Sequence, residues 1–181
     1  GIDRYETAEL VAYWVMDIVN AWSEGRWRKT AFFVRGDAFP DALAVAPHAY
    51  RAKIPILLVR PGSVPSYTSD AITFCSISEG IIVGGTAAVN ASTAATIGSL
   101  LGDAAVRWDG ADRYATAARC AREGINRGWL DYDEVGVATG TNFPDALGGG
   151  AACGSHGSPL VLTAPAVVPS ALDAFLSPLR Y

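Results

Sequence analysis

The chain has 181 residues, of which 50% are hydrophobic and 18% are charged, and its formal net charge is −4. This length and composition allow a packed core, which argues against a disordered chain. The acidic charge balance argues against a general nucleic-acid binder, which needs a basic face. Since no apolar run approaches the roughly 20 residues that a membrane-spanning helix requires, we expect no membrane span.

Helices and strands are expected to alternate from the beginning of the chain. The first helix is predicted by apolar residues at helical spacing, with Asp3 as its N-cap and Glu6 as the partner in a capping box. The apolar residues expected to face the core are Val11, Val15, Ile18, Val19 and Trp22. A buried strand is predicted at residues 30–34, and Pro40 fits the first turn of the next helix because its missing N–H is not needed there.

The same alternation continues up to residue 108. Strands are predicted at residues 54–59, 80–83 and 104–108, and helices near residues 66–74 and 92–101. Strands that alternate with helices imply right-handed crossovers and a parallel sheet. The predicted fold class is α/β, with small three-layer modules in tandem, each a mostly parallel sheet of about four strands flanked by helices.

An internal repeat organises the chain. The sequence DRYETA at residues 3–8 recurs as DRYATA at residues 112–117, an offset of 109 residues. The sequence FPDAL at residues 39–43 recurs identically at residues 143–147, an offset of 104 residues that later matches keep. Ordered matches at consistent offsets are typical of a duplicated structural module.

The repeat predicts the domain organisation. We expect a first module at residues 1–108 and a second at residues 109–181. The second module is expected to be C-terminally incomplete, because nothing in it corresponds to residues 80–85. The chain begins at Gly1 without an initiator methionine, so we also expect it to be a piece of a longer protein.

Polar and glycine-rich segments are predicted at the carboxyl ends of the strands, where ligands meet open parallel sheets. The candidate ligand-binding residues there are Asp37, Asp41, Gly84, Gly85, Thr86, Thr141, Asn142 and Asp145. The same residues also fit turn chemistry alone, with glycine for an unusual backbone angle and with proline and aspartate to start a helix. Both interpretations stay open at this point.

Arg4 and Arg113 are further candidates, because each follows the capping aspartate of a repeated motif. A guanidinium group offers a planar set of donors for phosphate or carboxylate oxygens. In the structural alternative, each arginine pairs with the aspartate before it, or with Asp41 or Asp145, and locks its helix to the adjacent loop.

Little in the sequence supports catalysis. Cys75, Cys120 and Cys153 have neither disulfide-framework nor metal-site spacing, so we interpret them as small buried hydrophobic residues. The glycine-rich segment at residues 148–154 lacks the spacing of a dinucleotide-binding loop, and close helix packing explains it better. A thiol nucleophile formed by Cys153 with His156 is disfavoured, since the other repeat has alanine at both positions. We expect no cofactor, no metal and no catalytic residue.

The ordered set of motifs resembles the cell wall binding repeat 2 family. The motifs that carry this resemblance lie at residues 3–8, 36–43, 55–58 and 82–89. The resemblance implies α/β modules that anchor surface-layer and other secreted proteins of Gram-positive bacteria to the wall, non-covalently, through an anionic secondary polysaccharide. It also implies an extracellular, cell-wall location and neighbouring modules in a pseudo-threefold trimer. The family's loop asparagine is kept as Asn142, whereas the first repeat has Ala38.

Three functions therefore remain under comparison. The favoured one is a non-catalytic wall anchor, in which arginine side chains and helix N-termini hold phosphate or carboxylate groups of a repeating polymer and tandem modules raise the avidity. One alternative is part of a peptidoglycan amidase or hydrolase whose catalytic domain lies outside this chain. The other is a purely self-assembling surface module without a glycan ligand.

Overall fold

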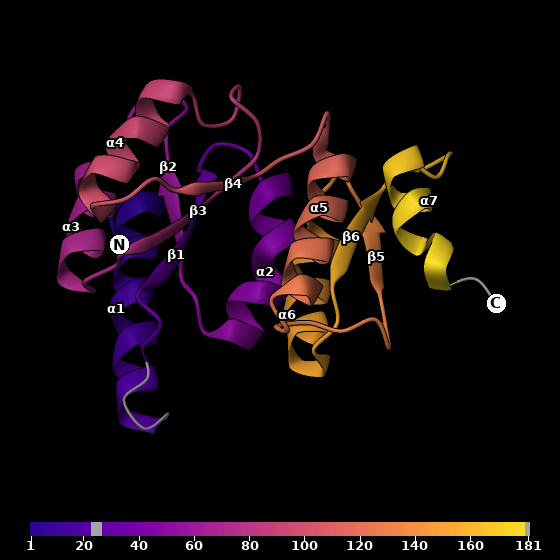
Figure 1. The fold of residues 1–181 in the computed structure, drawn as a ribbon, viewed down its shortest axis with the longest axis horizontal. Helices are drawn as coiled ribbons and strands as arrows, with labels where there is room; N and C mark the ends of the chain where they lie inside the picture. Colours follow the sequence, from indigo (N-terminus) through magenta and orange to yellow (C-terminus); the bar gives the residue numbers. More distant parts are fainter. Residues whose placement is uncertain (23–26, 180–181) are drawn as a thin grey trace. The chain divides into compact units, whose positions relative to one another are not determined.

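The computed structural model describes residues 1–22 and 27–179, and these residues form two compact units. Unit 1 contains Gly1–Ala38 and Lys53–Arg107, and unit 2 contains Phe39–Ala52 and Trp108–Tyr181. Helices and strands alternate along the described chain (Figure 1). One segment of the first repeat thus belongs to the second unit, and the module boundary after residue 108 stays a prediction about the repeat. Residues 180 and 181 of the predicted second module lie outside the described part.

Unit 1 is built on a sheet with the strand order β2-β1-β3-β4, in which β1 pairs in parallel with β2 and β3. Figure 1 shows α1, α3 and α4 on the same side of this sheet. This arrangement confirms the predicted α/β fold class, and the strand ends lie within two residues of the predicted ones. The elements are α1 (Arg4–Trp22), β1 (Thr30–Arg35), β2 (Ile56–Val59), α3 (Ser66–Phe74), β3 (Glu79–Val83), α4 (Ala91–Leu101) and β4 (Val106–Trp108).

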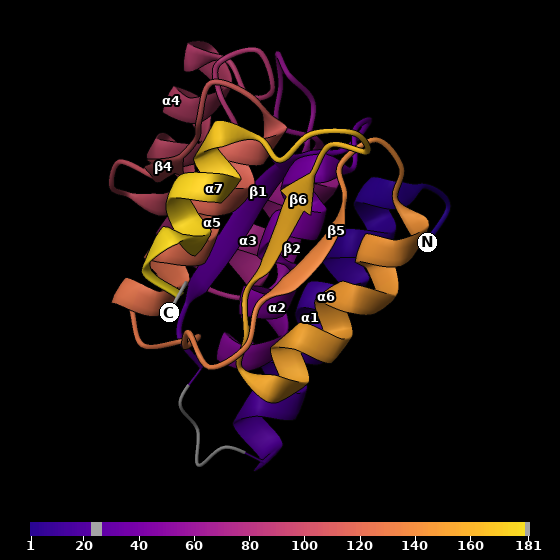
Figure 2. The same ribbon diagram turned by 90° about the vertical axis from the view of Figure 1, so that its right-hand side faces the viewer.

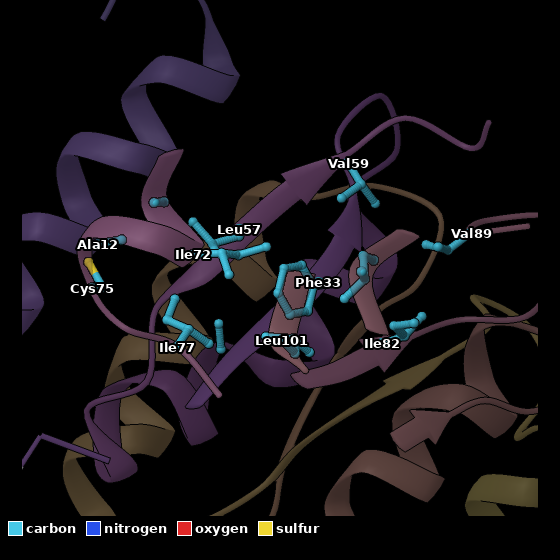
Figure 3. Packing of buried hydrophobic residues seen from close by; sticks show 13 residues of the cluster. Ala12, Phe33, Leu57, Val59, Ile72, Cys75, Ile77, Ile82, Val89 and Leu101 are labelled. Atoms are coloured by element: carbon cyan, nitrogen blue, oxygen red, sulfur yellow. The ribbon is translucent and has the colours of Figure 1, made fainter. Parts of the chain in front are cut away.

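The core of unit 1 lies between this sheet and its helices. Phe33, Leu57 and Ile82 come from three neighbouring strands and gather with Ile72 of α3 (Figure 3). Full burial of such a side chain contributes about 1.5–3 kcal/mol to the free energy of unfolding. Cys75 lies in the same cluster, which confirms it as a small buried hydrophobic residue, and burial raises the pKa of its thiol to about 11.

Unit 2 contains a parallel pair of strands, in which Val137 lies opposite Val161. Figure 2 shows α5 and α7 on one side of this pair and α6 on the other. Phe175 of α7 and Ala118 of α5 pack against Val161 in a small core. The elements are α2 (Pro40–Ala52), α5 (Arg113–Asn126), β5 (Gly136–Thr139), α6 (Pro144–His156), β6 (Leu160–Thr163), α7 (Ser170–Leu176) and a 3-10 turn (Ser177–Leu179). Within residues 1–22 and 27–179, no helix combines the length and apolarity needed to cross a membrane.

Helix α2 is the segment of the first repeat that belongs to unit 2, and it packs against α5, α6 and β6. Its contact with α6 depends on glycine. A Cβ at Gly150 would lie 2.7 Å from the Cβ of Ala46, and one at Gly154 would lie 2.6 Å from the Cβ of Tyr50. Close helix packing therefore explains Gly150 and Gly154 of the glycine-rich segment, whereas a Cβ at Gly148 would meet nothing within 4 Å.

The face of α1 that meets the core differs from the predicted one. Val19 is buried and Val15 is half-buried, as expected, but Val11, Ile18 and Trp22 are exposed. The residues that pack against the core are Ala12, Tyr13 and Met16. The prediction was wrong for the three exposed residues because α1 is apolar on two faces, and spacing alone does not show which face meets the sheet.

The start of α1 follows the predicted capping pattern in part. The Asp3 Oδ1 atom accepts the backbone N–H of Tyr5 at 2.8 Å and that of Glu6 at 2.9 Å. The Glu6 carboxylate accepts the backbone N–H of Ile2 instead of that of Asp3, so the capping box is shifted by one residue. In unit 2, the Asp112 Oδ1 atom caps α5 by accepting the N–H of Ala115 at 2.8 Å.

Candidate functional site

The same contact between an arginine and a loop occurs in both units. In unit 1, Nη1 of Arg4 donates a 2.6 Å hydrogen bond to the carbonyl oxygen of Gly36. In unit 2, Nη1 of Arg113 donates a 2.6 Å hydrogen bond to the carbonyl oxygen of Gly140. Each arginine therefore locks the start of its helix to the loop after the following strand. The acceptor is a backbone carbonyl, not one of the carboxylates considered from the sequence.

The tyrosine of each repeated motif explains the glycine in the same loop. A Cβ at Gly36 would lie 2.9 Å from Cε1 of Tyr5, and a Cβ at Gly140 would lie 2.6 Å from Cε1 of Tyr114. Real Cβ atoms do not approach a ring this closely, so both loops need glycine. The motif residues thus build one frame twice, with the arginine on one side of the loop backbone and the tyrosine ring against it.

Asp37, in the unit 1 loop, is a partner of arginine. Nη2 of Arg35 lies 2.9 Å from Oδ2 of Asp37, and Nε of Arg35 donates to the other carboxylate oxygen. These bonds from Arg35, with a smaller contribution from the charge of Arg4, hold the pKa of Asp37 below its usual range. The structure therefore brings Arg4 and Asp37 together, as two predicted site residues at one loop.

The unit 2 loop has uncharged polar groups in the corresponding place. The hydroxyl oxygens of Thr139 and Thr141 lie 2.9 Å apart and share a hydrogen bond. Oδ1 of Asn142 accepts the backbone N–H of Phe143 at 2.9 Å. Thr141 and Asn142 thus lie at the carboxyl end of β5 beside the Arg113 contact, and both are exposed.

The repeated FPDAL motifs meet each other in unit 2. The rings of Phe39 and Phe143 lie with their centroids 5.9 Å apart. Asp41 and Asp145 each lie in the first turn of a helix, where the positive end of the helix dipole favours a carboxylate. The identity of the two motifs is therefore explained by how α2 and α6 begin and pack.

Gly84, Gly85 and Thr86 lie in the loop between β3 and α4 in unit 1. The carbonyl oxygen of Gly84 accepts a 2.6 Å hydrogen bond from Nη1 of Arg107, and Nη2 of Arg107 donates to another carbonyl of the same loop. Asn90 caps α4, so the glycines precede the helix N-terminus and do not form it.

The sequence model of cell wall binding domain 2 matches residues 1–94 and 107–178, which is most of the chain. The chain belongs to the cell wall binding domain 2 (CWB2) family. A CWB2 module is a binding domain, and the family places the chain outside the cell, at the cell wall.

Two curated proteins of Bacillus subtilis (strain 168) are similar to this CWB2 chain. The amidase enhancer is 29% identical over 165 residues, which are 90% of this chain and 21% of that protein. The N-acetylmuramoyl-L-alanine amidase LytC is 39% identical over 122 residues, which are 67% of this chain and 23% of that protein. The CWB2 chain therefore spans less than a quarter of either relative.

Two solved structures from Clostridium difficile share the fold. Cwp6 superposes with a TM-score of 0.82 at 25% identity, over 98% of this chain and 26% of that chain. Cwp8 superposes with a TM-score of 0.75 at 27% identity, over 97% of this chain and 28% of that chain. The CWB2 fold extends over nearly the whole chain.

Three arginines at or near strand ends were not among the predicted site residues. Arg35 is the last residue of β1, Arg60 follows β2, and Arg107 lies in β4. The guanidinium carbon of Arg60 lies 5.0 Å from the centroid of the Tyr5 ring. The rule that ligands meet a parallel sheet at the carboxyl ends of its strands would have selected Arg35 and Arg60 as well.

In unit 2, a groove of about 610 Å³ lies beside Tyr114, the tyrosine that corresponds to Tyr5. Its lining includes Asp112, Tyr114, Ala164, Ala171 and Ala174. At the positions 104 residues earlier, unit 1 has Arg60, Tyr67 and Asp70. Because unit 2 has three alanines where unit 1 has larger polar side chains, Tyr114 lies beside an open groove.

The histidine and cysteine residues considered for catalysis interact with parts of the chain other than these loops. Nδ1 of His156 lies 3.0 Å from a carboxylate oxygen of Glu134 in an exposed pair. Cys120 is fully buried, which raises the pKa of its thiol well above the usual value. In the described part of the chain, no three His, Cys, Asp or Glu side chains are grouped so that they could hold a metal ion.

Proposed function

We propose that this CWB2 chain is a non-catalytic anchor that binds an anionic secondary polysaccharide of the Gram-positive wall at the carboxyl ends of its strands. The observation that carries the proposal is the arginine contact that both units keep with the same atoms and the same 2.6 Å distance. This bond uses one of the five N–H donors of a guanidinium group. Each arginine is thus held in place with further donors for phosphate or carboxylate oxygens.

Duplication supports the same proposal. Two edges that each bind a repeating polymer weakly gain avidity, because binding at the first raises the effective concentration at the second. The net charge of −4 does not oppose this, since local placement of arginine decides a contact and net charge mainly affects long-range steering.

Binding to purified walls tests the proposal. We expect the full-length protein that contains this chain to sediment with walls, and to remain in solution after acid extraction of the anionic polymer. The same walls with the polymer added back should recover binding. Equal binding before and after extraction would contradict the proposal.

The proposed anchor also needs neighbouring modules, and an apolar face on α1 supports this. In unit 2, Cys120 and Gly124 of α5 lie under α2, where the carbonyl of Cys120 bonds His48 and Gly124 leaves room for its ring. The residues 109 positions earlier are Val11 and Val15 of α1. Val11 is 50% exposed, so the face that α2 covers on α5 is open on α1.

A complementary face is open on α6. Leu43 of α2 is 5% exposed, whereas Leu147, at the same place in α6, is 63% exposed. In unit 2, α2 uses its face to cover α5. We therefore propose that an α6-type helix of a further module covers α1, as a head-to-tail contact that closes into a ring such as the expected trimer.

Negative charges introduced on this apolar face test the assembly. The double variant Trp14→Glu and Ile18→Glu alters exposed side chains, so the urea midpoint should change little while the full-length protein shifts to a smaller species in light scattering. Exposed Thr96 of α4 offers a matched control, and Thr96→Glu should leave the size unchanged. An unchanged size of the double variant would contradict a module contact at α1.

The amidase alternative rests on the names of the relatives. Amidase enhancer and LytC are each more than four times longer than their similarity to this chain. We propose that any such activity of the full-length protein lies outside the CWB2 chain. A zymogram with the 181-residue chain alone should stay blank. Self-assembly without polymer affinity, seen by combining light scattering with the wall assay, would instead favour the surface-module alternative.

A further inference from the structure

Three arginines surround the Gly36 loop of unit 1. Arg4 donates to the Gly36 carbonyl at 2.6 Å, and Arg35 is paired with Asp37 at 2.9 Å. Arg60 stacks over Tyr5, whose ring edge lies against Gly36. Because β1 and β2 are neighbouring parallel strands, Arg35 and Arg60 reach the same edge of the sheet.

The charged groups near this loop have both signs. The groups that lower the pKa of Asp37 are Arg35 first and then Arg4. Around Tyr67, desolvation, followed by the carboxylates of Glu6 and Asp3, raises the pKa of the tyrosine. Those two carboxylates also accept backbone N–H groups at the start of α1. The loop of residues 36 and 37 therefore lies beside three guanidinium groups, those of Arg4, Arg35 and Arg60, together with the carboxylate of Asp37.

The second module shows that two of these arginines are not needed to build the frame. Unit 2 keeps the Arg113 contact and the tyrosine against glycine. The residues 104 positions after Arg35 and Arg60 are Thr139 and Ala164. The frame of arginine, tyrosine and glycine therefore does not require Arg35 and Arg60, and Arg35 with Asp37 stands where unit 2 has the hydrogen-bonded Thr139 and Thr141.

We propose that the carboxyl edge of unit 1 is an oxyanion subsite, in which Arg35 and Arg60 join Arg4 around a phosphate or carboxylate group of the wall glycan. The matching edge of unit 2 keeps Arg113 but has Thr139, Thr141 and an open groove in place of the other two arginines, so it takes mainly uncharged parts of the same polymer. The two modules thus read different chemical groups of one repeating unit. This inference rests on the proposed wall binding and goes beyond it by assigning the more highly charged contact to one module.

Exchanging residues between the modules tests the subsite. The double variant Arg35→Thr and Arg60→Ala gives unit 1 the residues of unit 2. In the full-length protein we expect about tenfold weaker binding to purified walls, since charge-assisted hydrogen bonds to an oxyanion are lost. The reverse double variant, Thr139→Arg and Ala164→Arg, is expected to strengthen binding.

A matched control removes the same charge elsewhere. Arg28 is exposed and Arg119 pairs with Glu123 on the surface of α5, so Arg28→Ala with Arg119→Ala also removes two positive charges. We expect this control to bind walls as the unchanged protein does. Equal binding by the exchange variant, or an equal loss in the control, would overturn the subsite while leaving wall binding itself intact.

Chemical treatment of the walls distinguishes the two sources of the oxyanion. Hydrofluoric acid removes phosphodiesters, and carbodiimide coupling neutralises carboxylates. Whichever treatment abolishes the difference between the unchanged protein and the exchange variant identifies the group that Arg35 and Arg60 bind. A difference that survives both treatments would overturn an oxyanion ligand. If the exchange variant unfolds in urea too early to be compared, failure of the reverse variant to strengthen binding would overturn the proposal instead.

Discussion

Units 1 and 2 come from one duplicated sequence but differ in what they contain. Unit 1 has a four-stranded sheet, whereas unit 2 has a two-stranded one and includes a helix from the first repeat. In unit 2, α2 covers α5, while the matching face of α1 is open. The sequence repeat is therefore not the packing unit, because the first repeat contributes its second helix to the next unit.

The loops of the two units differ in charge while their frames agree. An arginine, a tyrosine and a glycine make the same contacts in both. Arg35 and Arg60 in unit 1 correspond to Thr139 and Ala164 in unit 2. The residues that both modules share therefore build the loop. The residues that differ between them are the ones that can give each module a different ligand.

The largest expected difference between the units is in their response to acid. Both histidines of the chain belong to unit 2, and His48 is buried against α5, where its Nε2 donates to the carbonyl of Cys120 at 2.8 Å. Burial lowers the pKa of His48 from 6.5 to about 4. Between these values the unfolded chain binds a proton that the folded unit does not. Unit 2 should thus lose up to about 3 kcal/mol of stability as the pH falls from about 6.5 to 4.

Hydrogen exchange of α2 and α5, compared with α3 and β1, measures this loss for each unit separately. His48→Gln should remove the extra acid sensitivity of unit 2, although it lowers stability at neutral pH. His156→Gln, on the exposed end of α6, is the matched control and should keep the sensitivity. Equal acid sensitivity of His48→Gln and the unchanged protein would rule out His48 as its source.

A second prediction concerns the contact between α2 and α6, which unit 1 does not contain. Gly150→Ala places a Cβ 2.7 Å from that of Ala46, so the helices must separate, at a cost of about 1–2 kcal/mol. Gly148→Ala, two residues earlier, meets nothing within 4 Å and should stabilise the helix by up to about 1 kcal/mol. Urea unfolding measures the change in stability of each variant, and we expect a loss for Gly150→Ala and a gain for Gly148→Ala. A change of the same sign in both would refute the close approach of α2 and α6.

Much of the fold was predictable from local pattern. The strand and helix ranges followed from periodicity. Pro40 begins α2 as predicted, because the first turn of a helix does not need the N–H that proline lacks. The face of α1 was not predictable, because Val11 and Ile18 are as apolar as the residues that meet the core. What covers an apolar face depends on the other elements, and spacing within one helix carries no information about them.

The candidate site was predictable in its place but not in its contacts. The edge of the sheet followed from general rules for parallel sheets, and Arg4 followed from the repeated motif. The acceptor of Arg4 is a carbonyl that no side-chain pattern reveals. Arg60 was missed because its relation to Tyr5 joins residues far apart in the sequence. Comparing the two repeats for differences, as well as for identities, would have selected it.

The smallest predicted effect concerns the two helix caps. Asp3 accepts two backbone N–H groups of α1, and Asp112 accepts that of Ala115 in α5. Removal of either cap by alanine should cost about 1 kcal/mol, and Asp3→Ala should cost a few tenths more because it leaves two donors without their acceptor. Asn at either position keeps an acceptor oxygen and should preserve most of the stability. Hydrogen exchange of the first turns of α1 and α5 assigns each loss to its unit, and a larger loss from Asp112→Ala than from Asp3→Ala would mean that factors other than the capping bonds set the stability of these helix ends.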